Sequence, residues 1–125
     1  SSPIDFTEKL FDLRAKQYKK EIKSDTIFYD RGPIDSIAYL KFKKINCPNR
    51  LINLAKTIKY DFYFIAEPWE KIYVNDEIRE ETFNQCKVIH QSIVSTYKQF
   101  NAELIILPFE SVNDRVEFIL NRIKI

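Results

Sequence analysis

The sequence predicts an α/β protein in which a parallel sheet is flanked by helices. Three short apolar runs, at residues 26–29, 60–67 and 103–107, have the length and composition of buried strands. Helical periodicity precedes the first run and follows each of the three, so successive strands are separated by helices. That order produces parallel βαβ units with right-handed crossovers. A chain of 125 residues suits one such domain.

Five helices are expected around these strands. The first is predicted from a cap at Asp5 to about Lys23, and its apolar residues form two rows at helical spacing. The others are predicted at about 33–43, at 50–58, from a cap at Asn75 or Asp76 to about residue 100, and after a cap at Ser111. Their apolar positions predict a core between the helices and the sheet.

Composition and net charge narrow the classes of protein to which this chain could belong. The net charge of +2 gives no reason to expect nucleic acid as a partner. No run reaches the roughly 18 apolar residues of a membrane span, and Ser1-Ser2-Pro3 does not resemble a signal peptide. Cys47 and Cys86 form no C-x-x-C, so we expect free thiols in a reducing, cytoplasmic setting.

The segment Asp30-Arg31-Gly32 follows the first predicted strand directly. An acid at the carboxyl end of such a strand points into the crevice where open α/β sheets bind their ligands. Arg31 carries a charged fork that suits phosphate oxygens. Gly32 is expected to allow a tight turn, and Pro33 to begin the next helix. Together these residues predict half of a nucleotide site.

The other half of that site is missing from the sequence. A phosphate loop of the form G-x-x-x-x-G-K-[ST] needs two glycines, and Gly32 is the only glycine in the chain. Three strands are also few for a sheet that is covered on both faces. We therefore expect a further strand and its phosphate loop upstream of Ser1, with residues 1–125 forming the C-terminal part of the domain.

Three segments resemble a known family; the third is the C-terminal run that ends in Leu107-Pro108 and continues to Arg115-Val116-x-Phe118-Ile119. Residues 28–40 (FYDRGPIDSIAYL) resemble the F-[FY]-D-R-G-x-x-D-x-x-A-Y segment of P-loop, AAA-type predicted ATPases, which are grouped with ribosylnicotinamide-kinase-like and other small-molecule-kinase-like proteins. Residues 67–83 (EPWEKIYVNDEIREETF) are similar to the P-P-W-x-x-I-Y-x-N-D-x-x-R-x-E-[ST]-F segment of that family. The chain departs from the pattern at Glu67, where the family often has proline, and in lacking the phosphate loop. The resemblance implies a three-layer P-loop fold.

The resemblance also implies roles for individual residues. Asp30 would hold Mg²⁺ or its water, and Arg31 would contact phosphate. Arg79 would close over the transferring phosphoryl group as part of a lid. Trp69 and Tyr73 would stack on a base or another planar substrate.

Glu67 ends a strand in the same crevice as Asp30, where we expect it to reach substrate as a second carboxylate. The other residues of the predicted site also have simpler interpretations. Asp30 could instead cap the following helix, and Arg31 could pair with a neighbouring aspartate. Arg79 stands among glutamates that offer pairs within the helix, worth about 0.3–0.5 kcal/mol each. Trp69 could be a packing aromatic.

The function predicted from these residues is that of a nucleoside-triphosphate-binding protein. It would use Mg²⁺ with ATP or GTP, either to hydrolyse the nucleotide or to transfer phosphate to a small acceptor as a kinase. The alternative is a non-catalytic α/β interaction module that has lost nucleotide binding. Its exposed sheet edge would then need a partner, such as a second copy in a homodimer, to cover it.

Overall fold

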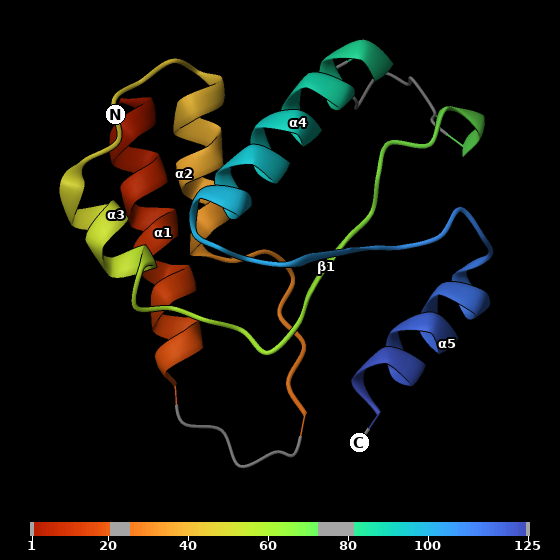
Figure 1. Ribbon diagram of the computed structural model, residues 1–125. Helices are drawn as coiled ribbons and strands as arrows, with labels where there is room; N and C mark the ends of the chain where they lie inside the picture. The colour runs from red at the N-terminus through yellow and green to blue at the C-terminus, as the bar shows by residue number, and fades with distance from the viewer. Residues whose placement is uncertain (1, 21–25, 73–81, 125) are drawn as a thin grey trace.

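The computed structural model describes residues 2–20, 26–72 and 82–124. The elements in chain order are α1 (Pro3–Lys19), α2 (Pro33–Phe42), α3 (Asn49–Ala55), β1 (Tyr63–Ile65), a short 3₁₀ turn η1 (Glu70–Ile72), α4 (Phe83–Gln99), β2 (Leu104–Ile106) and α5 (Val112–Ile123) (Figure 1). The predicted α/β class is confirmed. None of the described helices combines the length and the hydropathy needed to cross a membrane.

The sheet is smaller than predicted. β1 and β2 pair in parallel, with Tyr63 opposite Leu104 and Ile65 opposite Ile106, and α4 forms the crossover between them. The predicted first strand is wrong: residues 26–29 form no assigned strand, and Phe28 is 65% exposed. A strand exists only beside a hydrogen-bonded neighbour. In the described part of the chain, β1 and β2 are each other's hydrogen-bonded neighbours.

Helix starts follow local capping chemistry. The predicted cap at Asp5 is wrong, because Ser2 caps α1 by accepting a hydrogen bond (3.2 Å) from the backbone N–H of Asp5, which lies in the first turn. Ser111 caps α5 in the same way, as predicted. Pro33 is the first residue of α2, which is also as predicted.

The start of α4 differs from the prediction. Thr82 is extended and caps Phe83–Gln99 through a capping box with Gln85, in which each side chain bonds the other residue's backbone N–H at 3.1 and 2.7 Å. No helix therefore runs unbroken from residue 75 to residue 100. The predicted caps Asn75 and Asp76 lie outside the described residues.

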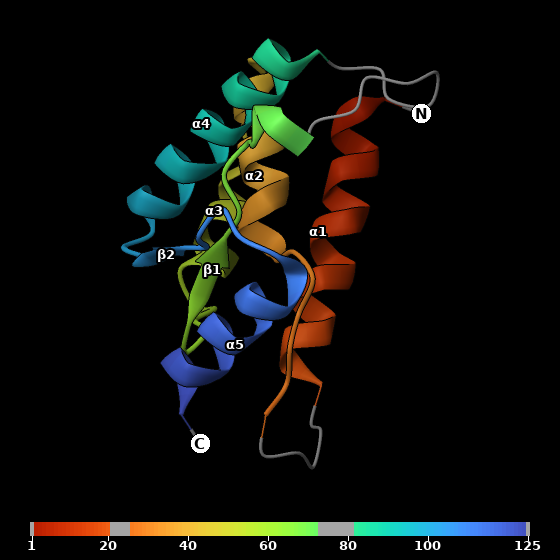
Figure 2. The same cartoon turned by 90° about the vertical axis from the view of Figure 1, so that its right-hand side faces the viewer.

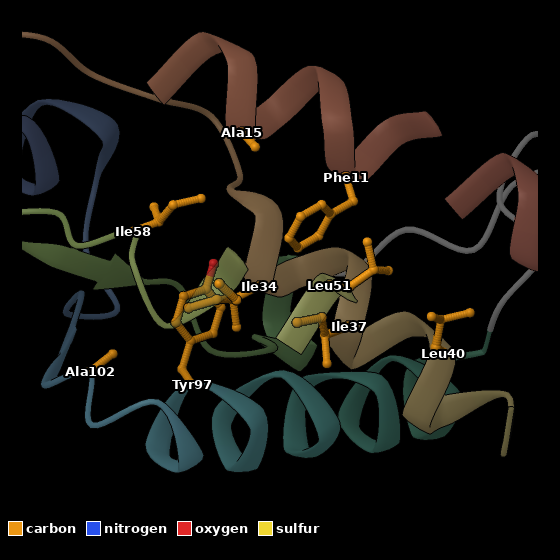
Figure 3. Packing of buried hydrophobic residues seen from close by; sticks show 10 residues of the cluster. Phe11, Ala15, Ile34, Ile37, Leu40, Leu51, Ile58, Tyr97 and Ala102 are labelled. Carbon is orange, nitrogen blue, oxygen red and sulfur yellow. The ribbon is translucent and has the colours of Figure 1, made fainter. Parts of the chain in front are cut away.

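A helical core occupies one side of the molecule. α2 packs between α1 and α4, and α3 lies beside α1 and α2 (Figures 1 and 2). Figure 3 shows their apolar side chains converging; the fully buried ones include Phe11, Ile34, Leu40 and Leu51. One row of α1 was wrongly assigned to the core, because Phe6 and Leu13 are exposed.

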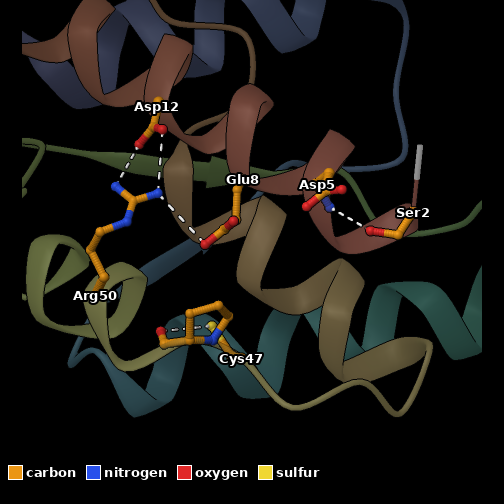
Figure 4. A network of polar contacts seen from close by, with 7 residues as sticks. Ser2, Asp5, Glu8, Asp12, Cys47 and Arg50 are labelled. Atoms are coloured by element: carbon orange, nitrogen blue, oxygen red, sulfur yellow. Dashed lines mark hydrogen bonds and ion pairs between the residues drawn. The ribbon is translucent and has the colours of Figure 1, made fainter.

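A surface ion cluster joins α3 to α1. Arg50 donates to both carboxylate oxygens of Asp12, at 2.9 and 3.3 Å, and lies 3.7 Å from Glu8 (Figure 4). The three side chains are substantially exposed, so the cluster orients α3 more than it stabilises the fold. Nearby, the thiol of Cys47 faces the carbonyl of Pro48, and both Cys47 and Cys86 are free.

α5 stands apart from the other helices, on the far side of the two strands (Figures 1 and 2). None of its residues is buried. Apolar residues Val112, Val116 and Leu120 are exposed along the helix. Residues of α5 line the same cleft as Asp30, Arg31, Glu67 and Trp69.

Candidate functional site

A cleft of about 1490 Å³ opens between residues 26–32 and β1. The segment 59–69 forms one wall and residues 26–32 form the other. Side chains of α4 and α5 complete the lining, among them Ile89, Ile93, Ile119 and Ile123. This volume exceeds the roughly 300–1,000 Å³ of a typical small-ligand pocket, so the cleft has room for a ligand.

The predicted site residues that fall within the described chain all line this cleft: Asp30, Arg31, Glu67 and Trp69. Asp30 follows the extended segment 26–29, and Glu67 follows β1. In open α/β folds the carboxyl ends of strands form one ligand-binding edge, which explains why residues distant in sequence meet here. Tyr73 and Arg79 lie outside the described residues, so their predicted roles stay predictions.

The turn before α2 is made by Arg31 rather than by Gly32. Arg31 has a left-handed backbone (φ 68°), whereas Gly32 is extended (φ −135°, ψ 178°). The prediction that Gly32 supplies the tight turn is therefore wrong. Glycine is needed for space, because a Cβ there would lie 3.3 Å from the ring of Tyr60.

Asp35 holds the side chain of Arg31. Their ion pair spans 3.5 Å, with Arg31 60% exposed and Asp35 12% exposed. The buried hydroxyl of Tyr97 on α4 also donates to Asp35. This is one of the pairings considered from the sequence, and it leaves most of the guanidinium facing solvent at the mouth of the cleft. Asp30 is exposed beside it.

Tyrosine rings form a cluster at the base of the cleft. Tyr60 contacts the rings of Tyr18, Tyr29 and Tyr63 at centroid distances of 5.1, 5.2 and 5.6 Å, and Tyr63 contacts Tyr97 at 5.7 Å. Burial, assisted by the neighbouring phenols, raises the pKa of Tyr60 to about 12. Burial and the charge of Asp35 raise the pKa of Tyr97 as well. Tyr60 and Tyr97 are therefore neutral at ordinary pH.

The sequence offered no signal for this cluster beyond seven tyrosines. Its members come from α1, from the segment before Asp30, from the β1 region and from α4. No spacing in the sequence relates these elements, so only the folded chain brings the rings together.

Trp69 lies in an aromatic and cationic group. Its ring stacks on Phe109 at 5.0 Å and 20°, and the guanidinium carbon of Arg115 lies 5.4 Å from the ring centroid. Arg115 Nε donates to the carbonyl of Pro108 at 2.8 Å. These contacts agree with the packing interpretation of Trp69, although the side chain also lines the cleft. No role was predicted from the sequence for Arg115.

Metal binding by the protein alone finds little support in this region. In residues 2–20, 26–72 and 82–124 no three His, Cys, Asp or Glu side chains group as a metal site. Mg²⁺ is usually held by one or two carboxylates together with substrate phosphates and water. Asp30, exposed on the rim of the cleft, fits that arrangement. His90 and Cys86 of α4 also line the cleft.

Comparison with protein-family models gave one match, to the family described as "AAA domain", over residues 1–115. The match includes every element from α1 to the start of α5, and it includes both walls of the cleft. Comparisons with curated proteins and with solved structures gave no match.

Proposed function

The chain belongs to the AAA-domain family of P-loop type, and we propose that its cleft binds a nucleoside triphosphate for Mg²⁺-dependent hydrolysis or phosphoryl transfer. The observation that carries this proposal is that Asp30, Arg31, Glu67 and Trp69 all line one cleft, with Asp30 directly after residues 26–29 and Glu67 shortly after β1. This is the edge where α/β sheets bind nucleotides.

The phosphate loop would come from a strand upstream of Ser1. The chain holds a single glycine, so it cannot form that loop itself. Residues 26–29 and β1 border the cleft from opposite sides, and Phe28 and Ile27 leave apolar surface exposed there. A parallel strand inserted between them would pair with both and would cover this surface. Its carboxyl end would place a phosphate loop beside Asp30.

The residues of the cleft then take distinct roles. Asp30 would hold Mg²⁺, which neutralises charge on the phosphates when bound. Arg31, held by Asp35, would donate to phosphate oxygens from the mouth of the cleft. Arg79 would contribute a second guanidinium. Trp69, Tyr73 and Glu67 would contact the base or the phosphate acceptor.

The test compares two exposed carboxylates that line the cleft, Asp30 and Asp61, in the complete protein. Asp30→Asn should lower Mg²⁺-dependent ATP or GTP turnover by about 10²-fold or more, because an electrostatic contact to the reacting phosphates is lost. Asp61→Asn, which alters an exposed carboxylate before β1, should leave turnover unchanged. Unchanged turnover in Asp30→Asn would remove Asp30 from the metal role.

A second assay distinguishes an ATPase from a kinase. A kinase should consume ATP only when a small hydroxylated acceptor is supplied. An ATPase that acts as a switch should hydrolyse ATP slowly by itself and change its affinity for a partner.

The exposed apolar residues Phe28 and Ile106 favour one rival, a non-catalytic interaction module. There a partner or a second copy of the chain would cover the exposed strand edge. Calorimetric titration of ATP with Mg²⁺ into residues 1–125 and into the complete protein decides between the two. Binding by the complete protein alone agrees with an upstream phosphate loop, whereas no binding by either favours the module.

A further inference from the structure

Two arginine–aspartate pairs of this molecule differ in their geometry. Arg50 donates hydrogen bonds to both carboxylate oxygens of Asp12, at 2.9 and 3.3 Å. Arg31 approaches Asp35 more loosely: its Nη1 atom lies 3.5 Å from Oδ2, which is longer than the roughly 2.7–2.9 Å of a charge-assisted N–H···O bond. Both arginine side chains are well exposed, at 60% for Arg31 and 49% for Arg50, so contact with solvent does not explain the difference.

Tyr97 occupies the other oxygen of Asp35. The Tyr97 hydroxyl donates to Oδ1, whereas Arg31 faces Oδ2. Tyr97 belongs to α4, is only 8% exposed and packs in the helical core with Ile34 (Figure 3). Burial and the charge of Asp35 raise the pKa of Tyr97, so the phenol keeps its proton. A neutral donor fixed in the core therefore holds one oxygen of Asp35.

This arrangement leaves Arg31 with unused binding capacity. A carboxylate with two available oxygens pairs with a guanidinium through two parallel hydrogen bonds, as Asp12 does with Arg50. Because Tyr97 holds Oδ1, Asp35 has one oxygen left for Arg31. The Arg31 side chain is 60% exposed and lines the cleft, so a ligand there has access to it.

We propose that Tyr97 is a positioning residue: by holding Oδ1 of Asp35, it prevents a two-oxygen pair with Arg31 and keeps that guanidinium available for the phosphate oxygens of a nucleotide. The inference rests on the proposed function for the identity of the ligand. Tyr97 acts through Asp35. Without its hydroxyl, Asp35 would turn both oxygens toward Arg31, and a ligand would have to break that pair before binding.

Rotation of the guanidinium groups tests the pairing in the complete protein without ligand. Exchange between the two Nη atoms of an arginine must break a two-oxygen pair, so ¹⁵N exchange spectroscopy distinguishes the two geometries. Arg31→Lys and Arg50→Lys assign the signals. In the parent protein, Arg31 should exchange faster than Arg50, and in Tyr97→Phe it should slow toward the Arg50 rate. Equal rates in the parent, or no slowing in Tyr97→Phe, would overturn the proposal.

Calorimetric titration with ATP and Mg²⁺ tests the consequence for binding. Tyr97→Phe should weaken ATP binding by about fivefold, and Arg31→Gln by about tenfold or more, since a charged hydrogen-bonded contact is impeded or lost. In the double variant, Tyr97→Phe should add no further loss, because its effect passes through Arg31. Additive losses would mean that Tyr97 does not act through Arg31, and would also overturn the proposal.

Thr96→Val is the matched control on α4. It removes a fully buried hydroxyl that donates to the carbonyl of Ser92 within the helix rather than to Asp35. It should leave both the Arg31 exchange rate and the ATP affinity at the parental values. The same changes in Thr96→Val as in Tyr97→Phe would mean that the effect is not specific to the Asp35 contact.

Circular dichroism checks that each variant is folded. Should Tyr97→Phe unfold, the comparison of Arg31 with Arg50 in the parent protein still tests the pairing. A parent protein that binds no ATP would disprove the proposed function and the ligand named here, whereas the exchange rates decide the role of Tyr97 separately. ATP binding by the parent with unchanged exchange and affinity in Tyr97→Phe would disprove this inference alone.

Discussion

The two sides of this molecule bury their apolar residues to very different degrees. On the helical side, Phe11, Leu40 and Leu51 from three helices are fully buried against one another. On the cleft side, Phe28 and Ile106 are largely exposed, and α5 contributes no buried residue. The helical side is a packed apolar core. The cleft side also carries apolar residues, but they are not buried.

This difference shows which parts of the chain are stable by themselves. Helices satisfy their own backbone hydrogen bonds, so α1 to α4 need only one another to bury apolar area. Strands need neighbours, and the segment 26–29 has the sequence of a strand but does not form one. The cleft side is therefore where a further chain segment or a ligand would add the most stability.

The largest expected effect contrasts one leucine from each side. Leu40→Ala should lower the free energy of unfolding by about 2–5 kcal/mol, because Leu40 is 0% exposed and its removal leaves a cavity. Leu120→Ala on α5 should cost less than about 0.5 kcal/mol, because Leu120 is 52% exposed. Urea denaturation measures both. Equal losses would contradict the distinction between the two sides.

Alkaline pH tests the tyrosines at the boundary between the sides. A folded-state pKa of about 12 for Tyr60, against 10.0 for the free group, means that the folded protein keeps a proton that the unfolded chain loses. The contribution is present in full below pH 10, and it is lost as the pH rises through about 12.

The free energy of unfolding should therefore fall over this interval. Tyr60→Phe should make the fall shallower, because a group that titrates differently in the two states is removed. Denaturant titrations at a series of alkaline pH values measure the slope. A slope identical to that of the parent protein would show that Tyr60 is not responsible.

Gly32→Ala tests the packing of the segment before α2 against the tyrosine cluster around Tyr60. The backbone of Gly32 is extended and suits alanine, but the new Cβ would lie 3.3 Å from the Tyr60 ring, which three other tyrosine rings contact. We expect a loss of about 1 kcal/mol, measured as a lower midpoint of thermal unfolding. A gain in stability, from the lower entropy of the unfolded chain, would mean that the tyrosine cluster yields easily.

The smallest effect concerns the surface of the helical side. Arg50→Ala should cost about 0.2–1 kcal/mol at low salt, and less at ~1 M salt, because its ion pairs with Asp12 and Glu8 are exposed and screened. A double-mutant cycle with Asp12→Ala isolates the pair. A coupling as large as the Leu40 effect would mean that charges, rather than apolar packing, hold α1 to α3.

Much of the candidate site could be predicted from sequence because it depends on chain order. Asp30 and Glu67 were both predicted at strand ends, and both line the cleft, although the strand predicted before Asp30 is not formed. The contacts that Arg115 makes with the ring of Trp69 and with the carbonyl of Pro108 could not be found in this way, because they depend on how the chain folds.

The sequence by itself determined most of the helices, the start of α2 at Pro33, the cap of α5 at Ser111, and the absence of a phosphate loop within these residues. These features depend on interactions within a few residues, where side-chain chemistry acts directly on the backbone. Only the tertiary structure decided that residues 26–29 form no strand, that Arg31 rather than Gly32 turns the chain, and which rings gather around Tyr60. Pairing, close approach and burial depend on neighbours far along the chain, and those neighbours exist only once the chain has folded.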